Sequence, residues 1–131
     1  MSVRTTLPVL LLILTFAVSP LHAQYVEIYR LDNLAKGVPE QEAIGKLATY
    51  FAVSADSIKS EKAEYQASLG ELYMAHEVAK LARSDAKTVM TEKKVKGWGE
   101  LIKEKNLKMD DIRKDSQRLE ESLKKTQGAN R

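Results

Sequence analysis

The chain of 131 residues contains no cysteine. This absence excludes disulfide bonds, thiol nucleophiles, cysteine-ligated zinc and a lipid anchor on cysteine. Proline and glycine are also scarce, with three prolines and six glycines, and residues 24–131 keep only Pro39. β-Branched residues do not alternate with polar ones over any long stretch, so strand signals are weak. The composition predicts an all-α fold that is held together by packing alone.

The sequence also lacks an apolar run long enough to span a bilayer, which needs about 20 residues. Its apolar run covers residues 7–18, follows Arg4, and leads into Ser-Pro-Leu-His-Ala at 19–23. This order is typical of a cleaved signal peptide, residues 1–23, and an uncleaved anchor is the alternative. Cleavage would leave residues 24–131, about one domain. We therefore expect a periplasmic or secreted protein with no stable membrane span after cleavage.

The chain also lacks a large excess of charge of either sign: 21 basic and 18 acidic residues give a net charge of +3. This is too small for strong steering of an anionic partner. The second half is mildly basic, but its charges alternate in sign, as in KEKNLKMDDIRKD at residues 103–115. Such interleaving is typical of a solvated helical face.

Helix starts are the clearest local signals in the sequence. Residues 24–42 are expected to form an N-terminal helical segment with a turn at Gly37-Val38-Pro39. Ser54, Ser68, and Ser84 or Asp85 are the expected N-caps of later helices. Ser68 and Glu71 have the spacing of a capping box, in which each side chain bonds the other residue's backbone amide. The helix that follows Ser68 is expected to end near Arg83.

An internal repeat organises the rest of the chain. Residues 45–60 align without a gap on residues 99–114, and SLGEL at 68–72 aligns on GWGEL at 97–101. Each unit is interpreted as two helices joined by a turn, so residues 43–124 are predicted to form a small bundle of about three αα-hairpins. Apolar residues become sparse near the end, which predicts a disordered tail at 125–131. The expected core comprises Leu47, Tyr50, Phe51, Ile58, Leu72, Met74, Val78, Val89, Leu101, Ile102 and Ile112.

The only tryptophan lies between two glycines, in Gly97-Trp98-Gly99. A dinucleotide-binding loop would need a preceding strand and a third glycine, which are missing. In the repeat, Gly97 takes the cap position of Ser68 and Trp98 matches Leu69. We therefore expect Trp98 to pack between hairpins, with its indole ring partly exposed. The residues predicted to make packing or partner contacts are Trp98, Leu69, Tyr73 and His76.

Residues for catalysis or metal binding are few. His76 is the only histidine after residue 23, and position 80 is lysine, so a two-histidine zinc motif is absent. No GxSxG motif is present, and His76 is the only histidine after residue 23 that could act as the base for a serine nucleophile. Adjacent acidic residues such as Glu120 and Glu121 diverge around a helix. We predict no catalytic residue, no metal site and no cofactor, and hence a protein that is not an enzyme.

LGELYMAHEVAK and KGWGELIKEKNL resemble segments of a group of small exported bacterial helical proteins with repeated Gly-(aromatic)-Gly-Glu-Leu sequences. The resemblance covers residues 43–108. It departs from the group at Leu69, which no glycine precedes, and at KEKNLK, where relatives have a more apolar helix end. The resemblance implies export and an all-α fold, and it implies no particular reaction.

The leading hypothesis is a noncatalytic exported protein that acts by binding an unidentified protein or envelope component. One alternative is a nucleic-acid-binding helix-turn-helix module, because AVSADSIKSEK would place Lys59 and Lys62 on a reading helix. The signal peptide and the lack of base-reading arginine and asparagine pairs weigh against it. The other alternative is a periplasmic chaperone.

Overall fold

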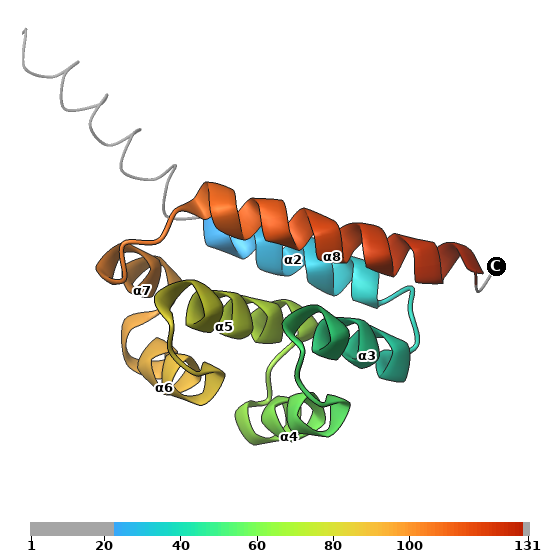
Figure 1. Cartoon of the computed structure of the whole chain (residues 1–131), viewed down its shortest axis with the longest axis horizontal. Coiled ribbons are helices and arrows are strands. Elements are labelled where there is room, and N and C mark those ends of the chain that lie inside the picture. Colours follow the sequence, from blue (N-terminus) through green and yellow to red (C-terminus); the bar gives the residue numbers. More distant parts are fainter. Residues whose placement is uncertain (1–22, 130–131) are drawn as a thin grey trace, which may run out of the picture.

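Figure 1 shows the computed structural model of the chain, which describes residues 23–129. That part of the chain contains helices and no strand, which confirms the predicted all-α fold. The predicted signal peptide lies outside the described residues except for Ala23, the first residue of α2. The helices are α2 (Ala23–Ala35), α3 (Glu40–Phe51), α4 (Ala55–Tyr65), α5 (Leu69–Ala82), α6 (Ala86–Lys96), α7 (Trp98–Glu104) and α8 (Met109–Ala129).

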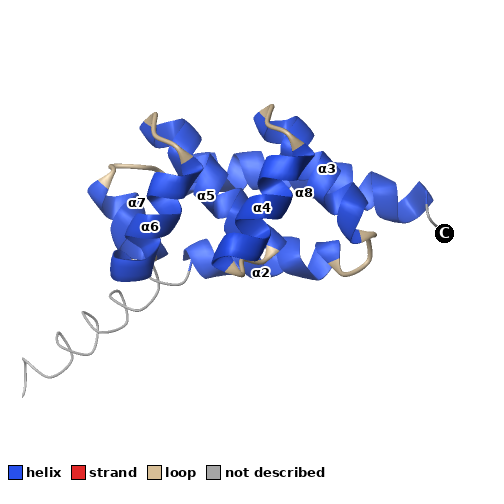
Figure 2. Cartoon of the chain, turned by 90° about the horizontal axis from the view of Figure 1, so that it is seen from below, coloured by secondary structure: helices blue, strands red, loops and turns tan. Residues whose placement is uncertain are grey.

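The helices form three layers. α2 and α8 lie side by side along the long axis of the molecule and run in the same direction (Figure 1). α3 and α5 make the middle layer: α5 contacts both α2 and α8, and α3 contacts α8. α4 and α6 lie on the opposite side of this layer from α8 (Figure 1), and Figure 2, seen from that side, shows α6 beside α7. α5 is the centre of the fold because it contacts helices of all three layers.

Two of the three predicted hairpins pack as consecutive helix pairs, α3 with α4 and α5 with α6. In the third unit, α7 packs on α6, whereas α8 leaves α7 and packs chiefly against α2 and α3. The reason is length and pattern: α7 has 7 residues, and α8 has 21 with a buried stripe of its own. That stripe is Ile112, Ser116, Leu119 and Leu123, at spacings of three and four.

The predicted disordered tail at 125–131 is wrong for residues 125–129, which are the last residues of α8. Leu119 and Leu123 lie in the part of the sequence where apolar residues become sparse, and both are fully buried. They pack because α2 supplies a complementary stripe, with Ile28 and Leu31 buried in the same core. Residues 130–131 lie outside the described part of the chain.

The predicted helix starts are confirmed. The Ser54 hydroxyl accepts a hydrogen bond from the Ser57 backbone N–H at 3.1 Å. Ser68 and Glu71 form both halves of the capping box at the start of α5. Of the two candidates for the next cap, Asp85 takes the position and accepts from the Thr88 N–H at 2.9 Å.

Helix ends follow a rule that the sequence did not reveal. α3, α4 and α5 each end at a residue in the left-handed conformation that is not glycine, namely Ala52, Gln66 and Arg83, with φ of 54°, 50° and 55°. A β-carbon makes this conformation unfavourable by about 1–2 kcal/mol. Hydrogen bonds from the capping amides to the last helical carbonyls offset this cost. One of them runs from the Ala52 N–H to the carbonyl of Thr49.

Replacing Ala52 with glycine should therefore stabilise the protein. Ala52 is exposed, so Ala52→Gly removes the left-handed strain without leaving a cavity. Glycine loses more backbone entropy on folding, and the net expected gain is about 0.5–1 kcal/mol. Urea unfolding followed by circular dichroism measures it. The matched control is Ala63→Gly, inside α4 and exposed, which should destabilise by about 1 kcal/mol.

The core contains most of the residues that the sequence predicted. All of the predicted core residues are buried except Tyr50 and Phe51, which are half-buried at its edge. Their rings pack edge to face, with centroids 4.9 Å apart. Phe51 also contacts the Tyr73 ring at 5.8 Å, so the edge of the core is an aromatic cluster between α3 and α5.

Candidate functional site

The four residues predicted to make packing or partner contacts are all buried. Trp98 is 1% exposed, Tyr73 0%, Leu69 6% and His76 9%. The prediction of a partly exposed indole is therefore wrong. Trp98 lies at the start of α7, which packs on α6, and the Lys93 ammonium nitrogen lies 5.9 Å from the ring centroid. Packing accounts for these residues better than contact with a partner.

The glycines around Trp98 have separate structural roles. Gly97 caps both α6 and α7 at a φ of 79°, which few other residues adopt. A β-carbon at Gly99 would lie 2.9 Å from the side-chain amide nitrogen of Gln24. Gly97 thus makes the turn, and Gly99 lets α7 approach the start of α2. Neither role involves a phosphate.

His76 is held in a buried pair. Its Nε2 lies 2.6 Å from an Oε atom of Glu61, and each side chain is 9% exposed. The imidazole also packs on the Phe51 ring, with centroids 5.3 Å apart. Within residues 23–129, no three histidine, aspartate or glutamate side chains are grouped so as to hold a metal ion. His76 therefore joins α5 to α4.

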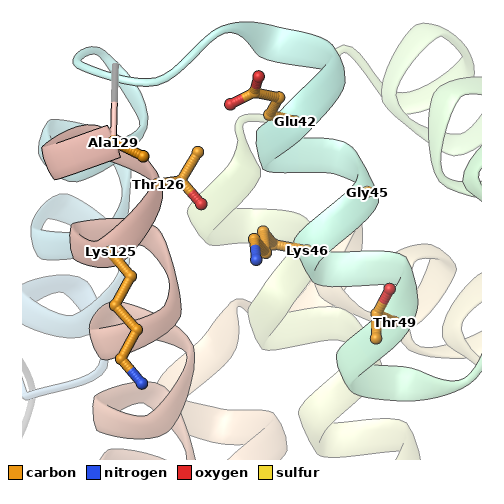
Figure 3. A pocket seen from close by; sticks show the side chains of 7 residues that line it. All are labelled: Glu42, Gly45, Lys46, Thr49, Lys125, Thr126 and Ala129. Atoms are coloured by element: carbon orange, nitrogen blue, oxygen red, sulfur yellow. The ribbon is translucent and has the colours of Figure 1, made fainter. Parts of the chain in front are cut away.

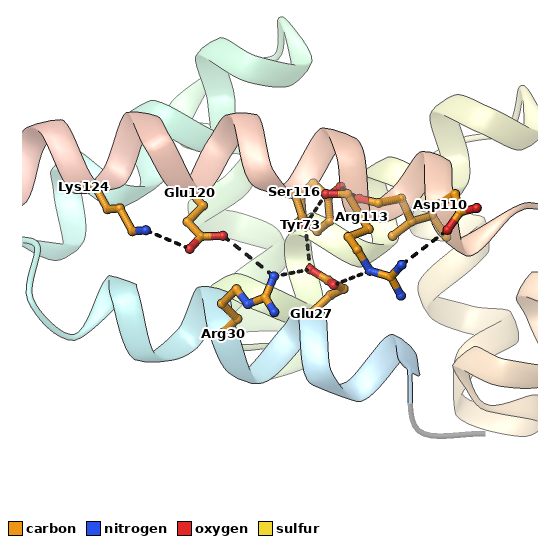
Figure 4. A network of polar contacts seen from close by, with 9 residues as sticks. Glu27, Arg30, Tyr73, Asp110, Arg113, Ser116, Glu120 and Lys124 are labelled. Atoms are coloured by element: carbon orange, nitrogen blue, oxygen red, sulfur yellow. Dashed lines mark hydrogen bonds and ion pairs between the residues drawn. The ribbon is translucent and has the colours of Figure 1, made fainter. Parts of the chain in front are cut away.

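A buried acidic side chain joins α2 to α8. Glu27, 1% exposed, accepts a hydrogen bond from the Ser116 hydroxyl at 2.6 Å and one from Arg113 Nε at 3.3 Å (Figure 4). Arg30 lies 3.7 Å from Glu27 and 4.0 Å from Glu120, and so extends the network along α8. These contacts link residues up to 89 positions apart, so no local sequence signal could have indicated them.

Tyr73 adds a bond between α5 and α8 in the same region. Its hydroxyl donates to the backbone carbonyl of Ile112 at 2.6 Å (Figure 4). Burial, followed by the charge of Glu77, raises the pKa of the Tyr73 phenol far above its ordinary value. The hydroxyl therefore stays a hydrogen-bond donor over the physiological pH range.

The most unusual polar group is Glu77, on the side of α5 that faces α8. Its side chain is fully buried, and within the described residues no donor forms a hydrogen bond to either carboxyl oxygen. The Lys80 ammonium lies 3.6 Å from it and donates instead to Asp115, at 3.0 Å. Burial, and then the Asp115 carboxylate, raise the pKa of Glu77 to about 8. The sequence did not indicate this group, because the helical pattern does not distinguish Glu77 from an exposed glutamate.

An open groove of about 570 Å³ runs between α3 and α8 (Figure 3). Its lining mixes charged and small residues: Glu42, Gly45, Lys46, Thr49, Lys125, Thr126 and Ala129. Lys46 and Lys125 are both exposed, and none of the lining residues is buried. The groove lacks the apolar floor and convergent polar groups that are typical of small-ligand sites.

The exposed apolar side chains are concentrated on α2. Tyr25, Val26 and Tyr29 are 43%, 50% and 68% exposed, and we call these three residues the α2 face. The spacing of residues 25 and 29 in α2 places the two tyrosines one turn apart on the same side of the helix. The buried side of α2 is formed by other residues, Gln24, Glu27, Ile28 and Leu31.

No protein-family model, curated protein or solved structure matches the chain. The resemblance to small exported bacterial helical proteins thus stays a prediction from the sequence. None of the helices in residues 23–129 is long and apolar enough to cross a bilayer. The function must be inferred from the geometry of the described residues.

Proposed function

We propose that the protein is an exported, noncatalytic helical protein that binds another protein through the α2 face. The observation that carries this proposal is the gathering of Tyr25, Val26 and Tyr29 on the outer side of one helix. Tyrosine is enriched at the centres of protein interfaces because it buries a large ring and keeps a polar tip. Contiguous exposed apolar side chains are also uncommon on monomeric proteins that bind nothing.

The chemistry of the face points to a protein partner. Within α2, charged residues are buried or lie beside the face: Glu27 is bonded to α8, and Arg30 is drawn toward Glu27 and Glu120. The face is therefore neutral, with two hydroxyls at its surface. A matching surface would be apolar with a few hydrogen-bonding groups, as in the central part of a protein interface.

The nucleic-acid alternative has less support from the same criteria. Lys62 of α4 forms an ion pair with Glu40 at 3.1 Å, so it is already partly neutralised. The neighbouring exposed residues on α4 include Asp56 and Glu64 beside Lys59. A helix with this charge balance lacks the excess of cations that phosphate contacts require.

Export is tested by fractionating the producing cell and sequencing the N-terminus of the purified protein. The expected N-terminal residue is Gln24, in the periplasm or the medium. A protein that keeps residues 1–23 and stays in the cytosol would contradict this part of the proposal.

Binding is tested with the double variant Tyr25→Ser, Tyr29→Ser. Both rings are exposed, so the free energy of unfolding should change by less than about 0.5 kcal/mol. Crosslinking in intact cells followed by mass spectrometry identifies the partner, and titration calorimetry should show at least a tenfold loss of affinity. The matched control is Val95→Ser on α6, where the side chain is 84% exposed. Equal affinity of both variants would exclude the α2 face as the binding surface.

A further inference from the structure

The second feature that calls for an explanation is the contact between Glu77 of α5 and Asp115 of α8. The Lys80 ammonium contacts both carboxyl groups, at 3.6 Å from a Glu77 oxygen and 3.0 Å from an Asp115 oxygen. Burial and then hydrogen bonding with Asp115 raise the pKa of Glu77, and the same interaction lowers the pKa of Asp115. Two carboxylates are both acceptors, so they cannot bond while both are ionised. A hydrogen bond forms only when one of them carries a proton. The geometry therefore requires either a shared proton or two unbonded, mutually repelling charges.

The surroundings decide which group holds the proton. Asp115 is 15% exposed and has Lys80 at 3.0 Å and Arg118 at 3.9 Å. After Glu77 and Lys80, the Tyr50 hydroxyl of α3 also lowers the pKa of Asp115. Glu77 is fully buried and has no donor of its own. Asp115 is thus stabilised as the anion, and Glu77 as the neutral acid that donates to it.

Charges on the other helices around α5 do not change this assignment. From α2, Glu27 is bonded to Arg113 and Ser116. From α4, Glu61 is paired with His76. α4 and α6 lie on the opposite side of α5 from α8 (Figure 1). Lys80 is the cation nearest to both carboxyl groups, and one ammonium can neutralise only one carboxylate.

We propose that Glu77 and Asp115 hold one proton between them at neutral pH, and that loss of this proton loosens the contact between α5 and α8. The pair would make the packing of α8 sensitive to mildly alkaline pH. This inference does not depend on the α2 face or on export.

The direction of the pH effect follows from the pKa shifts. The pKa of Glu77 is raised in the folded protein, from 4.5 to about 8. Its contribution to stability is therefore complete below pH 4.5 and is lost as the pH rises through 8. The pKa of Asp115 is lowered from 3.8, chiefly by the hydrogen bond with Glu77. Its contribution is present above pH 3.8 and is lost as the pH falls through the folded pKa.

The experiment makes two measurements on the full chain from pH 5 to 9.5. Carbon-13 NMR of the Glu77 side-chain carboxyl should give a titration midpoint near 8. Hydrogen exchange, expressed as protection factors, should fall at least tenfold in residues 112–123 across this midpoint. Protection in α4 should change much less. A Glu77 midpoint below 6 would overturn the proposal.

Two variants test whether the shared proton, and not burial alone, raises the pKa of Glu77. Glu77→Gln keeps the shape and donates an amide hydrogen to Asp115, so α8 should stay protected at pH 9. Asp115→Asn supplies a donor to the Glu77 carboxylate, and the Glu77 midpoint should fall by at least one pH unit. An unchanged Glu77 midpoint in Asp115→Asn would show that burial alone raises the pKa of Glu77, and it would refute the shared proton. Glu121→Gln, exposed on α8, is the control and should keep the alkaline transition.

Discussion

Gly70→Ala is expected to destabilise the protein by about 3 kcal/mol, at the upper end of the cost of overpacking a core. A β-carbon at this position would lie 2.4 Å from the backbone carbonyl oxygen of Ile28 and 2.9 Å from its α-carbon. These are backbone atoms of α2, so the whole helix would have to move. The move would also stretch the hydrogen bond from the Gly70 N–H to Asp32, which is 2.7 Å long.

Gly45→Ala is the matched control and should have the opposite sign. Gly45 lies in α3, and a β-carbon there would meet no atom within 4 Å. Alanine should then stabilise the helix by about 0.5–1 kcal/mol through its higher helix propensity. Urea unfolding curves of both variants measure the difference. If Gly70→Ala were neutral, the close contact between α2 and α5 would not exist in solution.

Trp98→Ala is expected to cost about 3–5 kcal/mol, because it empties the space of the largest buried side chain. α7 has only 7 residues and no side-chain cap, so it has little stability apart from this contact. We expect loss of the native contacts of α7 before global unfolding. The loss is measured by urea unfolding followed by circular dichroism, since the variant has no tryptophan fluorescence.

The control for Trp98→Ala is Val95→Ala, three residues earlier on the exposed side of α6. It should change the free energy of unfolding by less than about 0.5 kcal/mol. In the wild type, the fluorescence emission should be shifted to the blue, as is typical of a ring that water does not reach. A change below about 0.5 kcal/mol for Trp98→Ala would contradict the burial of the indole.

Local chemistry made part of this fold predictable. Ser68 with Glu71, and Asp85 with Thr88, are interactions over three positions, so their sequence spacing is sufficient evidence. The match of Trp98 with Leu69 likewise placed the start of α7 correctly. The all-α class follows from composition and from such signals together.

The tertiary contacts could not be predicted, because they depend on residues that are far apart in the sequence. Whether a glutamate is exposed or buried depends on what faces it, and the partners of Glu27 and Glu77 are 89 and 38 positions away, at Ser116 and Asp115. The repeat in the sequence predicted α8 as the second helix of a hairpin. Its packing on α2 can be predicted only when the buried residues of both helices are known. The left-handed cap at Ala52 left no signal, since glycine is the residue expected there.

The parallel arrangement of α2 and α8 has a consequence for how the chain folds. Parallel neighbours cannot be joined by a short turn, so residues 36–108 together act as the connection between them. The entropy of closing so long a loop is recovered only after the intervening helices have become compact. We therefore expect the local pairs α3–α4 and α5–α6 to form early and the α2–α8 pair last. Until residues 109–129 arrive, the buried side of α2, including Glu27, has no partner from α8, so the last helix completes the core.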